Sequence, residues 1–278
     1  MNNQKIINSR LFMELRSKID SYIAIPSLSR NEGEFIAYLK GKLAEGDIPE
    51  YYSVTEVDDT LRIASRVPSK NTIFSHADRV PTAGKPKTNI ITMQGELYLE
   101  SQLDNAVSIA VMMHLIEQHT PVNWVITTRE ECCANQYQIV NYIEEHPGYS
   151  FLDLDIDVTD NIDRDIFSGV VSIRNGDNFM PFNKELISEL RASADVLGIK
   201  HVAKDGDWMI DEMGMALCTL CNQRNLDRDT LHENMRFAYL GIPIWNYHTA
   251  KEFTHPAAMV NAVRVLAEFA KLPCTQVS

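Results

Sequence analysis

Hydrophobic and polar positions alternate along the chain with two periods, which predict helices and short strands in turn. Apolar residues at helical spacing predict six helices, over 9–25, 32–45, 104–116, 136–144, 184–197 and 257–271. Asp104 is the expected N-cap of the third of these helices. Runs of β-type residues predict strands over 52–57, 61–67, 71–75, 124–128 and 151–158. The segment 89–99 is typical of a hairpin, because Gln94-Gly95 separates two alternating runs.

Helices that alternate with short apolar strands indicate an α/β fold. The expected architecture is a three-layer α/β/α sandwich around a mixed, partly parallel central sheet. Internal repeats, low-complexity tracts and a convincing linker are all missing from the sequence. We therefore expect residues 1–278 to form a single catalytic domain.

Composition narrows the classes of protein that the chain can belong to. The sequence is 45% hydrophobic, which is ordinary for a globular protein. Its net charge is −12, and without a run of Lys or Arg a nucleic-acid partner is not expected. The N-terminus lacks the features of a signal peptide, and no apolar stretch is long enough to span a membrane. Five cysteines without framework spacing favour a reducing compartment, so we expect a cytoplasmic protein.

Residues that bind divalent metals follow the predicted strands. His76 comes directly after the strand 71–75, and Asp78 is close enough along the chain to orient its imidazole. Asp104 lies at the start of a helix, and Glu130-Glu131 follow the strand 124–128. Histidine nitrogens and carboxylate oxygens are the ligands that zinc uses in catalytic sites. In α/β proteins such sites lie at strand ends, so these side chains are expected to meet.

Two further segments offer ligands, each with competing residues. The strand 151–158 carries Asp153, Asp155 and Asp157 on one face, and spacing alone does not choose among them. A late histidine, His248, follows an apolar run, and His255 competes with it. A site for two metals would also need a bridging carboxylate and a general base.

The ordered set of motifs resembles the two-zinc exopeptidases. The motifs are His76-Ala77-Asp78-Arg79-Val80-Pro81, Leu103-Asp104-Asn105, Glu130-Glu131, Asp157-Val158-Thr159, and His248 with Glu252 four residues later. This superfamily includes the glutamyl and tetrahedral aminopeptidases, the bacterial leucyl aminopeptidases, and related carboxypeptidases and deacylases. The similarity extends from Ile25 to Glu252. No single motif is specific, whereas their order and spacing are.

The resemblance implies a site in which water held between two zinc ions attacks an amide carbonyl. His76 and Asp157 would bind the first ion. Glu131 and His248 would bind the second, and Asp104 would bridge the two. Glu130 would be the general base, and Asp78 would support His76. Asp157 is preferred to its neighbours because it matches the family's Asp-Val-Thr pattern, and His248 is preferred to His255 because of Glu252.

The implied function is that of a zinc-dependent, aminopeptidase-like hydrolase acting on a small peptide or an N-acyl amino compound. Two Zn²⁺ per chain are expected, other divalent metals are left open, and so is a homo-oligomer. The sequence departs from the family at Cys133, where a glycine is usual, and at Cys132 before it. The short segment between His76 and Asp104 leaves no room for the usual accessory domain. These departures keep two alternatives in view: a catalytically silent or repurposed metal-binding relative, and an α/β binding domain without metal.

Overall fold

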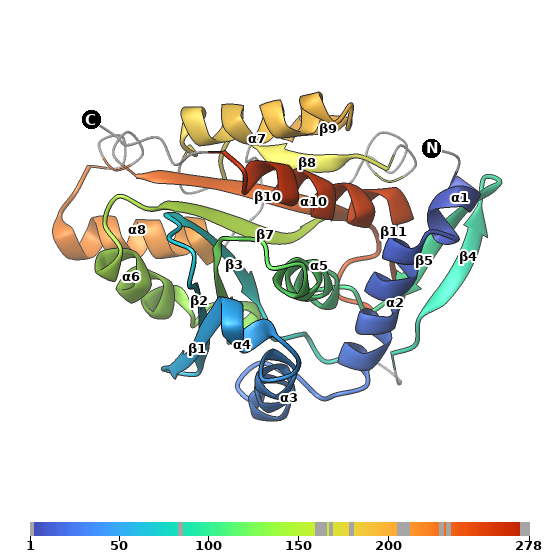
Figure 1. Cartoon of the computed structure of the whole chain (residues 1–278), viewed down its shortest axis with the longest axis horizontal. Helices are drawn as coiled ribbons and strands as arrows, with labels where there is room; N and C mark the ends of the chain where they lie inside the picture. The colour runs from blue at the N-terminus through green and yellow to red at the C-terminus, as the bar shows by residue number, and fades with distance from the viewer. Residues whose placement is uncertain are drawn as a thin grey trace.

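The computed structural model describes residues 3–82, 86–158, 166, 169–177, 181–204, 212–227, 231 and 235–272 (Figure 1). Its helices are α1 (Asn3–Ile7), α2 (Arg10–Ile23), α3 (Gly33–Leu43), α4 (Ile48–Tyr51), α5 (Ala106–Glu117), η1 (Glu130–Cys132), α6 (Gln136–Glu145), α7 (Lys184–Val196), α8 (Glu212–Arg224) and α10 (Pro256–Phe269). Its strands are β1 (Tyr52–Val57), β2 (Thr60–Ser65), β3 (Asn71–His76), β4 (Asn89–Met93), β5 (Glu96–Ser101), β6 (Asn123–Thr127), β7 (Ser150–Val158), β8 (Val171–Arg174), β9 (His201–Lys204), β10 (Arg236–Ile244) and β11 (Glu252–Thr254).

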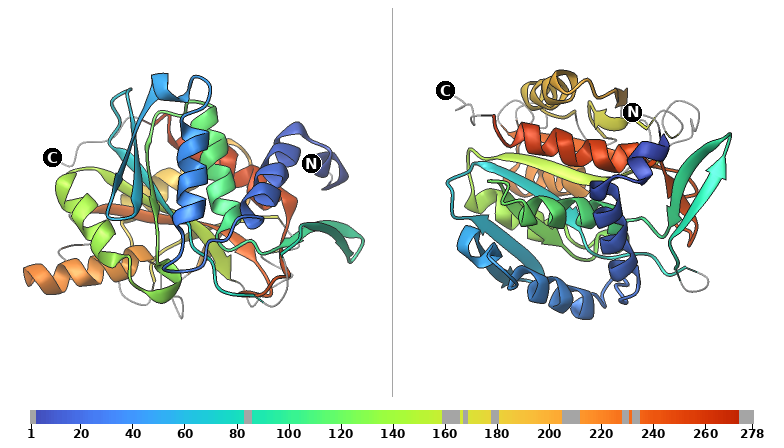
Figure 2. Two further views of the ribbon diagram at one scale, coloured as in Figure 1. Left: turned by 90° about the horizontal axis from the view of Figure 1, so that it is seen from below. Right: turned by 45° about the vertical axis from the view of Figure 1, so that its right-hand side comes forward.

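An eight-stranded mixed sheet forms the centre of the molecule, in the order β1-β2-β6-β3-β7-β10-β8-β9. The four central strands, β6, β3, β7 and β10, run parallel to one another, while β1, β2 and β8 introduce antiparallel pairs. Helices cover both faces: α2, α5 and α10 pack together on one side, and α6 packs with α8 on the other (Figure 2). The predicted α/β/α sandwich with a mixed, partly parallel sheet is confirmed.

A smaller antiparallel sheet, in the order β11-β5-β4, lies beside the main one (Figure 1). Its strand β5 leads into Asp104, and its strand β11 begins at Glu252. Two aromatic side chains, Tyr98 and Phe253, pack against each other within it. This sheet therefore fixes the approach of two segments that the candidate site uses.

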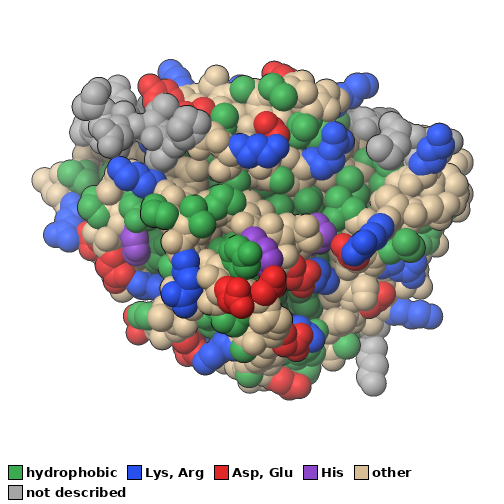
Figure 3. All heavy atoms as spheres, viewed as in Figure 1, with side chains coloured by type: hydrophobic (Ala, Val, Ile, Leu, Met, Phe, Trp, Pro, Cys, Tyr) green, Lys and Arg blue, Asp and Glu red, His purple; other side chains and the backbone are tan. Residues whose placement is uncertain are grey.

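The helix α5 lies within the core. Every residue of that helix from Ala106 to Ile116 is buried, and a helix that is apolar all round is typical of one enclosed by other elements. Charged side chains of both signs are interspersed on the face of the molecule shown in Figure 3. Among the described residues, no helix combines the length and the apolar character that crossing a membrane requires.

Most predicted elements are present with bounds shifted by only a few residues, whereas α1, α4, β8, β9 and β11 are additional. Three further details differ. Asp104 is not the N-cap of α5: the helix begins at Ala106 and its cap position is Asn105. The strand β10 was expected only as an apolar approach to His248, because Gly241 and Pro243 interrupt its pattern. The helix α8 was not predicted, since apolar and polar residues do not segregate along it.

Candidate metal centre

The site lies where the central parallel strands end. β3 ends at His76, and the neighbouring β6 ends at Thr127, just before the turn that carries Glu130 and Glu131. On the other side of β3, Phe74 pairs with Asp153 of β7. Continuing this parallel ladder by two residues places His76 beside Asp155. The strands thus bring an imidazole and several carboxylates to one edge of the sheet.

His76 lies at the centre of the first group of ligands. Its Nε2 is 3.3 Å from Asp104 Oδ1, 3.4 Å from Asp155 Oδ1 and 3.9 Å from Glu130 Oε2. The imidazole is buried. Burial alone would lower its pKa, but the surrounding carboxylates, Asp155 foremost, outweigh that effect and hold the pKa well above its ordinary value.

His248 belongs to a second group that shares Asp104 with the first. Its Nε2 is 3.0 Å from Glu131 Oε2 and 3.5 Å from Asp104 Oδ2. Burial acts to lower the pKa of His248, whereas Asp104 and Glu131 raise it to about 10. Asp104 therefore presents one carboxylate oxygen to each histidine, which is the arrangement of a bridging ligand.

The carboxylates of this cluster have too few positive charges and hydrogen-bond donors among the described residues near them to balance their negative charge. Burial is the main cause that raises the pKa of Glu131 to about 7 and that of Asp155 to about 6. Asp104 Oδ1 and Glu131 Oε1 are buried and accept no hydrogen bond from the residues that the structure describes. Buried carboxylates that lack donors are costly unless a cation lies among them.

These residues fit a pair of divalent cations. Potential ligand atoms of His76, Asp104 and Asp155 lie within 4.8 Å of one another, and so do those of Asp104, Glu131 and His248. Nitrogen and carboxylate oxygen donors in sets of three suit catalytic zinc, which leaves a further coordination position open. A third set, His76, Glu130 and Glu131, is equally close together. The first two sets share Asp104, so its carboxylate belongs to both groups.

The structure corrects the choice among the three aspartates of β7. Asp155, rather than Asp157, lies against His76. Asp157 is fully buried two residues further along the strand and forms an ion pair with Arg174 of β8. Side chains two residues apart on a strand are about 6.6 Å apart, so only one of them reaches the end of β3. Thr159 of the Asp-Val-Thr motif is outside the described residues.

Asp78 supports the site more widely than predicted. Its Oδ1 lies 3.4 Å from His76 Nδ1, so that the carboxylate and the imidazole are neighbours. Its two oxygens also accept the backbone N–H groups of Glu130 and Glu131, each at 3.0 Å. Burial would raise the pKa of Asp78, but His76 and these donors lower it. One carboxylate thus joins the two parts of the cluster that arise from β3 and β6.

Glu252 is a positioning residue whose role was not predicted. Its side chain is fully buried, and it accepts the backbone N–H groups of Leu103, Asp104 and His248. Burial is the first cause that raises its pKa to about 8, followed by the charge of Asp104. Glu252 therefore ties the segment that carries the bridging carboxylate to the loop that carries the late histidine. Its position four residues after His248 was the only signal in the sequence.

The turn that carries Glu130 and Glu131 has left-handed backbone at both ends. Arg129 has φ +66° and Cys133 has φ +52°. Glycine adopts such angles without steric cost, which explains physically why a glycine suits position 133. The Cys132 thiol donates to the carbonyl oxygen of Arg129.

His255, the competitor of His248, has a different task. Its Nδ1 accepts the backbone N–H of Ala257 at 3.0 Å and so caps α10. Its ring also meets Tyr98 edge-on. Burial lowers the pKa of His255 to about 4, so the ring is neutral. Among the described residues it belongs to none of the groups that could hold a metal.

No protein-family model and no curated protein matches this sequence. Solved structures match it along nearly its whole length. A TET aminopeptidase from the archaeon Thaumarchaeota archaeon SCGC AB-539-E09 is 11% identical with a TM-score of 0.71, covering 94% of this chain and 96% of its own. The Pyrococcus horikoshii TET1 peptidase is 12% identical with a TM-score of 0.67, covering 93% and 100%. A Staphylococcus aureus tripeptidase is 14% identical with a TM-score of 0.62, covering 94% and 98%. The chain therefore shares the fold of these peptidases.

Proposed function

We propose that this chain is an aminopeptidase-like, zinc-dependent hydrolase that cleaves an amide bond in a small peptide or an N-acyl amino compound. Two zinc ions would be held in adjacent sites with Asp104 as the shared ligand. His76 and Asp155 complete one set, and Glu131 and His248 complete the other. The observation that carries the proposal is Asp104, whose two oxygens face the two histidines separately.

The division of tasks among the carboxylates supports hydrolysis. When bound, the cations supply Lewis acidity to the substrate carbonyl and to water. Glu130 is partly exposed and lies at the edge of the cluster, 3.9 Å from His76 Nε2. It is placed to accept the proton of the attacking water and to return that proton to the departing amine. Asp78 accepts the backbone N–H of Glu130. This hydrogen bond would fix the position from which the side chain of the proposed general base extends.

The likeness to solved structures supports peptide substrates. The neighbours described above are aminopeptidases and a tripeptidase. The Pyrococcus horikoshii peptidase assembles into a tetrahedron or a large octahedral shell. For this chain we propose a single catalytic domain over residues 1–278 and a cytoplasmic location. Self-association is part of the proposal, and light scattering of the purified chain measures it.

A hydrolysis panel tests the function. The purified, zinc-loaded chain is assayed on aminoacyl anilides, short peptides and N-acyl amino acids. We expect turnover of at least one class, loss of turnover with a chelator and recovery on adding zinc. Two bound zinc ions without hydrolysis of any class would favour the catalytically silent relative, and no bound metal would favour a plain binding domain.

A further inference from the structure

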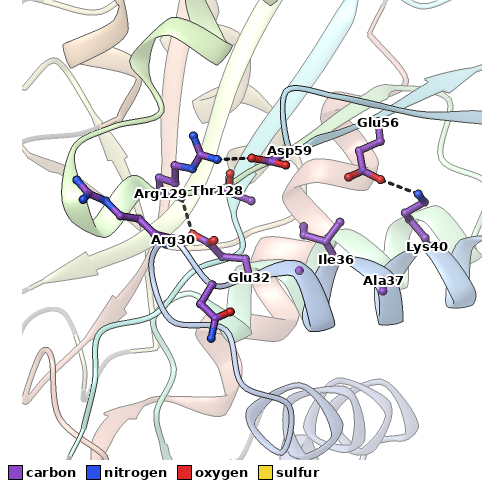
Figure 4. A pocket seen from close by; sticks show the side chains of 11 residues that line it. Arg30, Glu32, Ile36, Ala37, Lys40, Glu56, Asp59, Thr128 and Arg129 are labelled. Atoms are coloured by element: carbon purple, nitrogen blue, oxygen red, sulfur yellow. Dashed lines mark hydrogen bonds and ion pairs between the residues drawn. The ribbon is translucent and has the colours of Figure 1, made fainter.

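Glu32 is a buried carboxylate that the proposed chemistry does not use. It lies at the start of α3, beside a cavity of about 430 Å³ that Thr128 and Arg129 also line (Figure 4). Although it occupies the N-cap position, its side chain makes no cap hydrogen bond to the helix. Instead its Oε1 accepts the backbone N–H of Arg30 at 2.9 Å and that of Arg129 at 3.0 Å.

The contact with Arg129 lies at the start of the turn that carries Glu130 and Glu131. Arg129 is the left-handed residue that directly precedes Glu130, and a non-glycine residue in this conformation persists only where its surroundings hold it. Glu32 holds the N–H of Arg129, and Asp78 holds those of Glu130 and Glu131. Three successive amides are thus fixed by two buried carboxylates from separate segments.

The other charged side chains around the cavity are engaged with each other or lie open. Lys40 pairs with Glu56, and the Arg129 guanidinium pairs with Asp59. No described residue forms an ion pair with Glu32, and the Arg30 side chain is exposed. The carboxylate of Glu32 therefore acts on the backbone of the turn, and its removal breaks no salt bridge within the described part of the chain.

We propose that Glu32 is a positioning residue that sets the direction of Glu130 and Glu131 through the backbone of Arg129. The effect on turnover rests on the proposed function, whereas the effect on the turn does not. A displacement of about 1 Å in a catalytic group lowers rates by about 100-fold, so a small shift of the turn has a measurable consequence.

The test compares two substitutions of Glu32 with two controls in zinc-loaded protein. Glu32→Ala removes the acceptor, and Glu32→Gln keeps an oxygen that can accept both N–H groups. Glu56→Ala truncates an acid of the same cavity that does not touch the turn. Ile36→Ala lowers stability from the same helix by leaving space in the core and keeps the carboxylate of Glu32.

Three readouts are taken: amide hydrogen exchange over residues 127–134, zinc affinity, and kcat and KM on the best substrate. For Glu32→Ala we expect amide exchange at the turn to be at least about tenfold faster, and binding of the zinc that Glu131 holds to be about tenfold weaker. We expect kcat to fall by about 10- to 100-fold, with KM within about threefold of the wild-type value. Glu32→Gln should recover most of each loss, and both controls should stay near wild type.

Wild-type exchange, affinity and kcat in Glu32→Ala would overturn the inference and leave the proposed function intact. An equal loss of kcat in Ile36→Ala at a matched fall in Tm would also overturn it, because stability would then be the cause. If the wild-type chain hydrolyses no substrate while exchange and zinc affinity respond as expected, the proposed function fails and the role of Glu32 at the turn stands.

Discussion

Two aspartates of β7 show how the same residue type on the same strand face can have opposite surroundings. Asp157 is fully buried, and Arg174 supplies its counter-charge from a neighbouring strand. Asp155, two residues earlier, lies with His76 near Asp104 and Glu130. The first carboxylate has its counter-charge within the protein. The second belongs to a group in which carboxylates outnumber the positive charges that the described residues provide.

This difference separates a structural ion pair from a binding site better than burial does. Both aspartates are buried, and both lie at the carboxyl end of the sheet. What distinguishes the candidate metal centre is that its carboxylates gather around two histidines, with Asp104 facing both. The comparison leads to four predictions, which separate groups that act with bound cations from groups whose partners lie within the protein.

The largest expected effect is that of Glu130→Gln. An amide cannot accept the proton of the attacking water, so kcat should fall by about 100- to 10,000-fold. Glu130 lies at the edge of the cluster, and bound zinc should remain at two ions per chain. Steady-state kinetics and metal analysis measure both quantities, with Glu56→Gln as the control. Full activity in Glu130→Gln would show that another group is the base.

Asn substitutions at 155 and 157 should have opposite effects. Asp157→Asn removes the negative charge that β7 supplies to the buried Arg174 and should lower the free energy of unfolding by about 3–5 kcal/mol, with zinc stoichiometry unchanged. Asp155→Asn should weaken zinc binding by about 100-fold or more, because even partners that only orient a ligand change metal affinity by about 10- to 100-fold.

The two variants should also change the free energy of unfolding in opposite directions when zinc is absent. Burial raises the folded-state pKa of Asp155 to about 6, so its contribution to stability is lost as the pH rises from about 4 to 6. Asp155→Asn should therefore stabilise the zinc-stripped chain at pH 7, as measured by urea unfolding. Destabilisation by this substitution and normal zinc binding would together contradict the assignment of Asp155 as a ligand.

His255 should make the stability of the chain depend on pH. His255 is neutral, and its folded-state pKa of about 4 lies below the ordinary value near 6.5. Because the unfolded chain binds this proton first, the contribution of His255 is complete above about pH 6.5 and is lost as the pH falls toward 4. The loss should be about 3 kcal/mol.

His255→Asn provides the control for this prediction. Asparagine is also a good N-cap, so the substitution should keep α10 capped and remove this part of the pH dependence. Unfolding by urea at several pH values measures the difference between the two proteins. An unchanged pH profile in His255→Asn would show that the acid sensitivity arises elsewhere.

The smallest expected effect is that of Cys133→Gly. Cys133 is exposed and has left-handed backbone, so glycine should raise the free energy of unfolding by about 1 kcal/mol and leave kcat within about twofold. Calorimetry and steady-state kinetics measure the two quantities. A large loss of activity would instead give the thiol a direct part in the site.

The sequence predicted the layered fold and most of the residues of the candidate site for identifiable reasons. Apolar periodicity indicated the strands that end at His76 and before Glu130, and parallel strands bring such ends together. The choice between Asp155 and Asp157 depends on the register of β7 against β3, which the sequence of one strand does not contain. The same limit applies to Glu32, because its contact with Arg129 joins segments that are distant along the chain.

The most direct test of the account is a crystal structure of the zinc-loaded chain with anomalous differences measured on both sides of the zinc edge. We predict two zinc peaks, one beside His76 and Asp155 and one beside Glu131 and His248, with Asp104 bound to both. A single peak, peaks that lie elsewhere, or a zinc ion bound by Asp157 in place of Arg174 would contradict it.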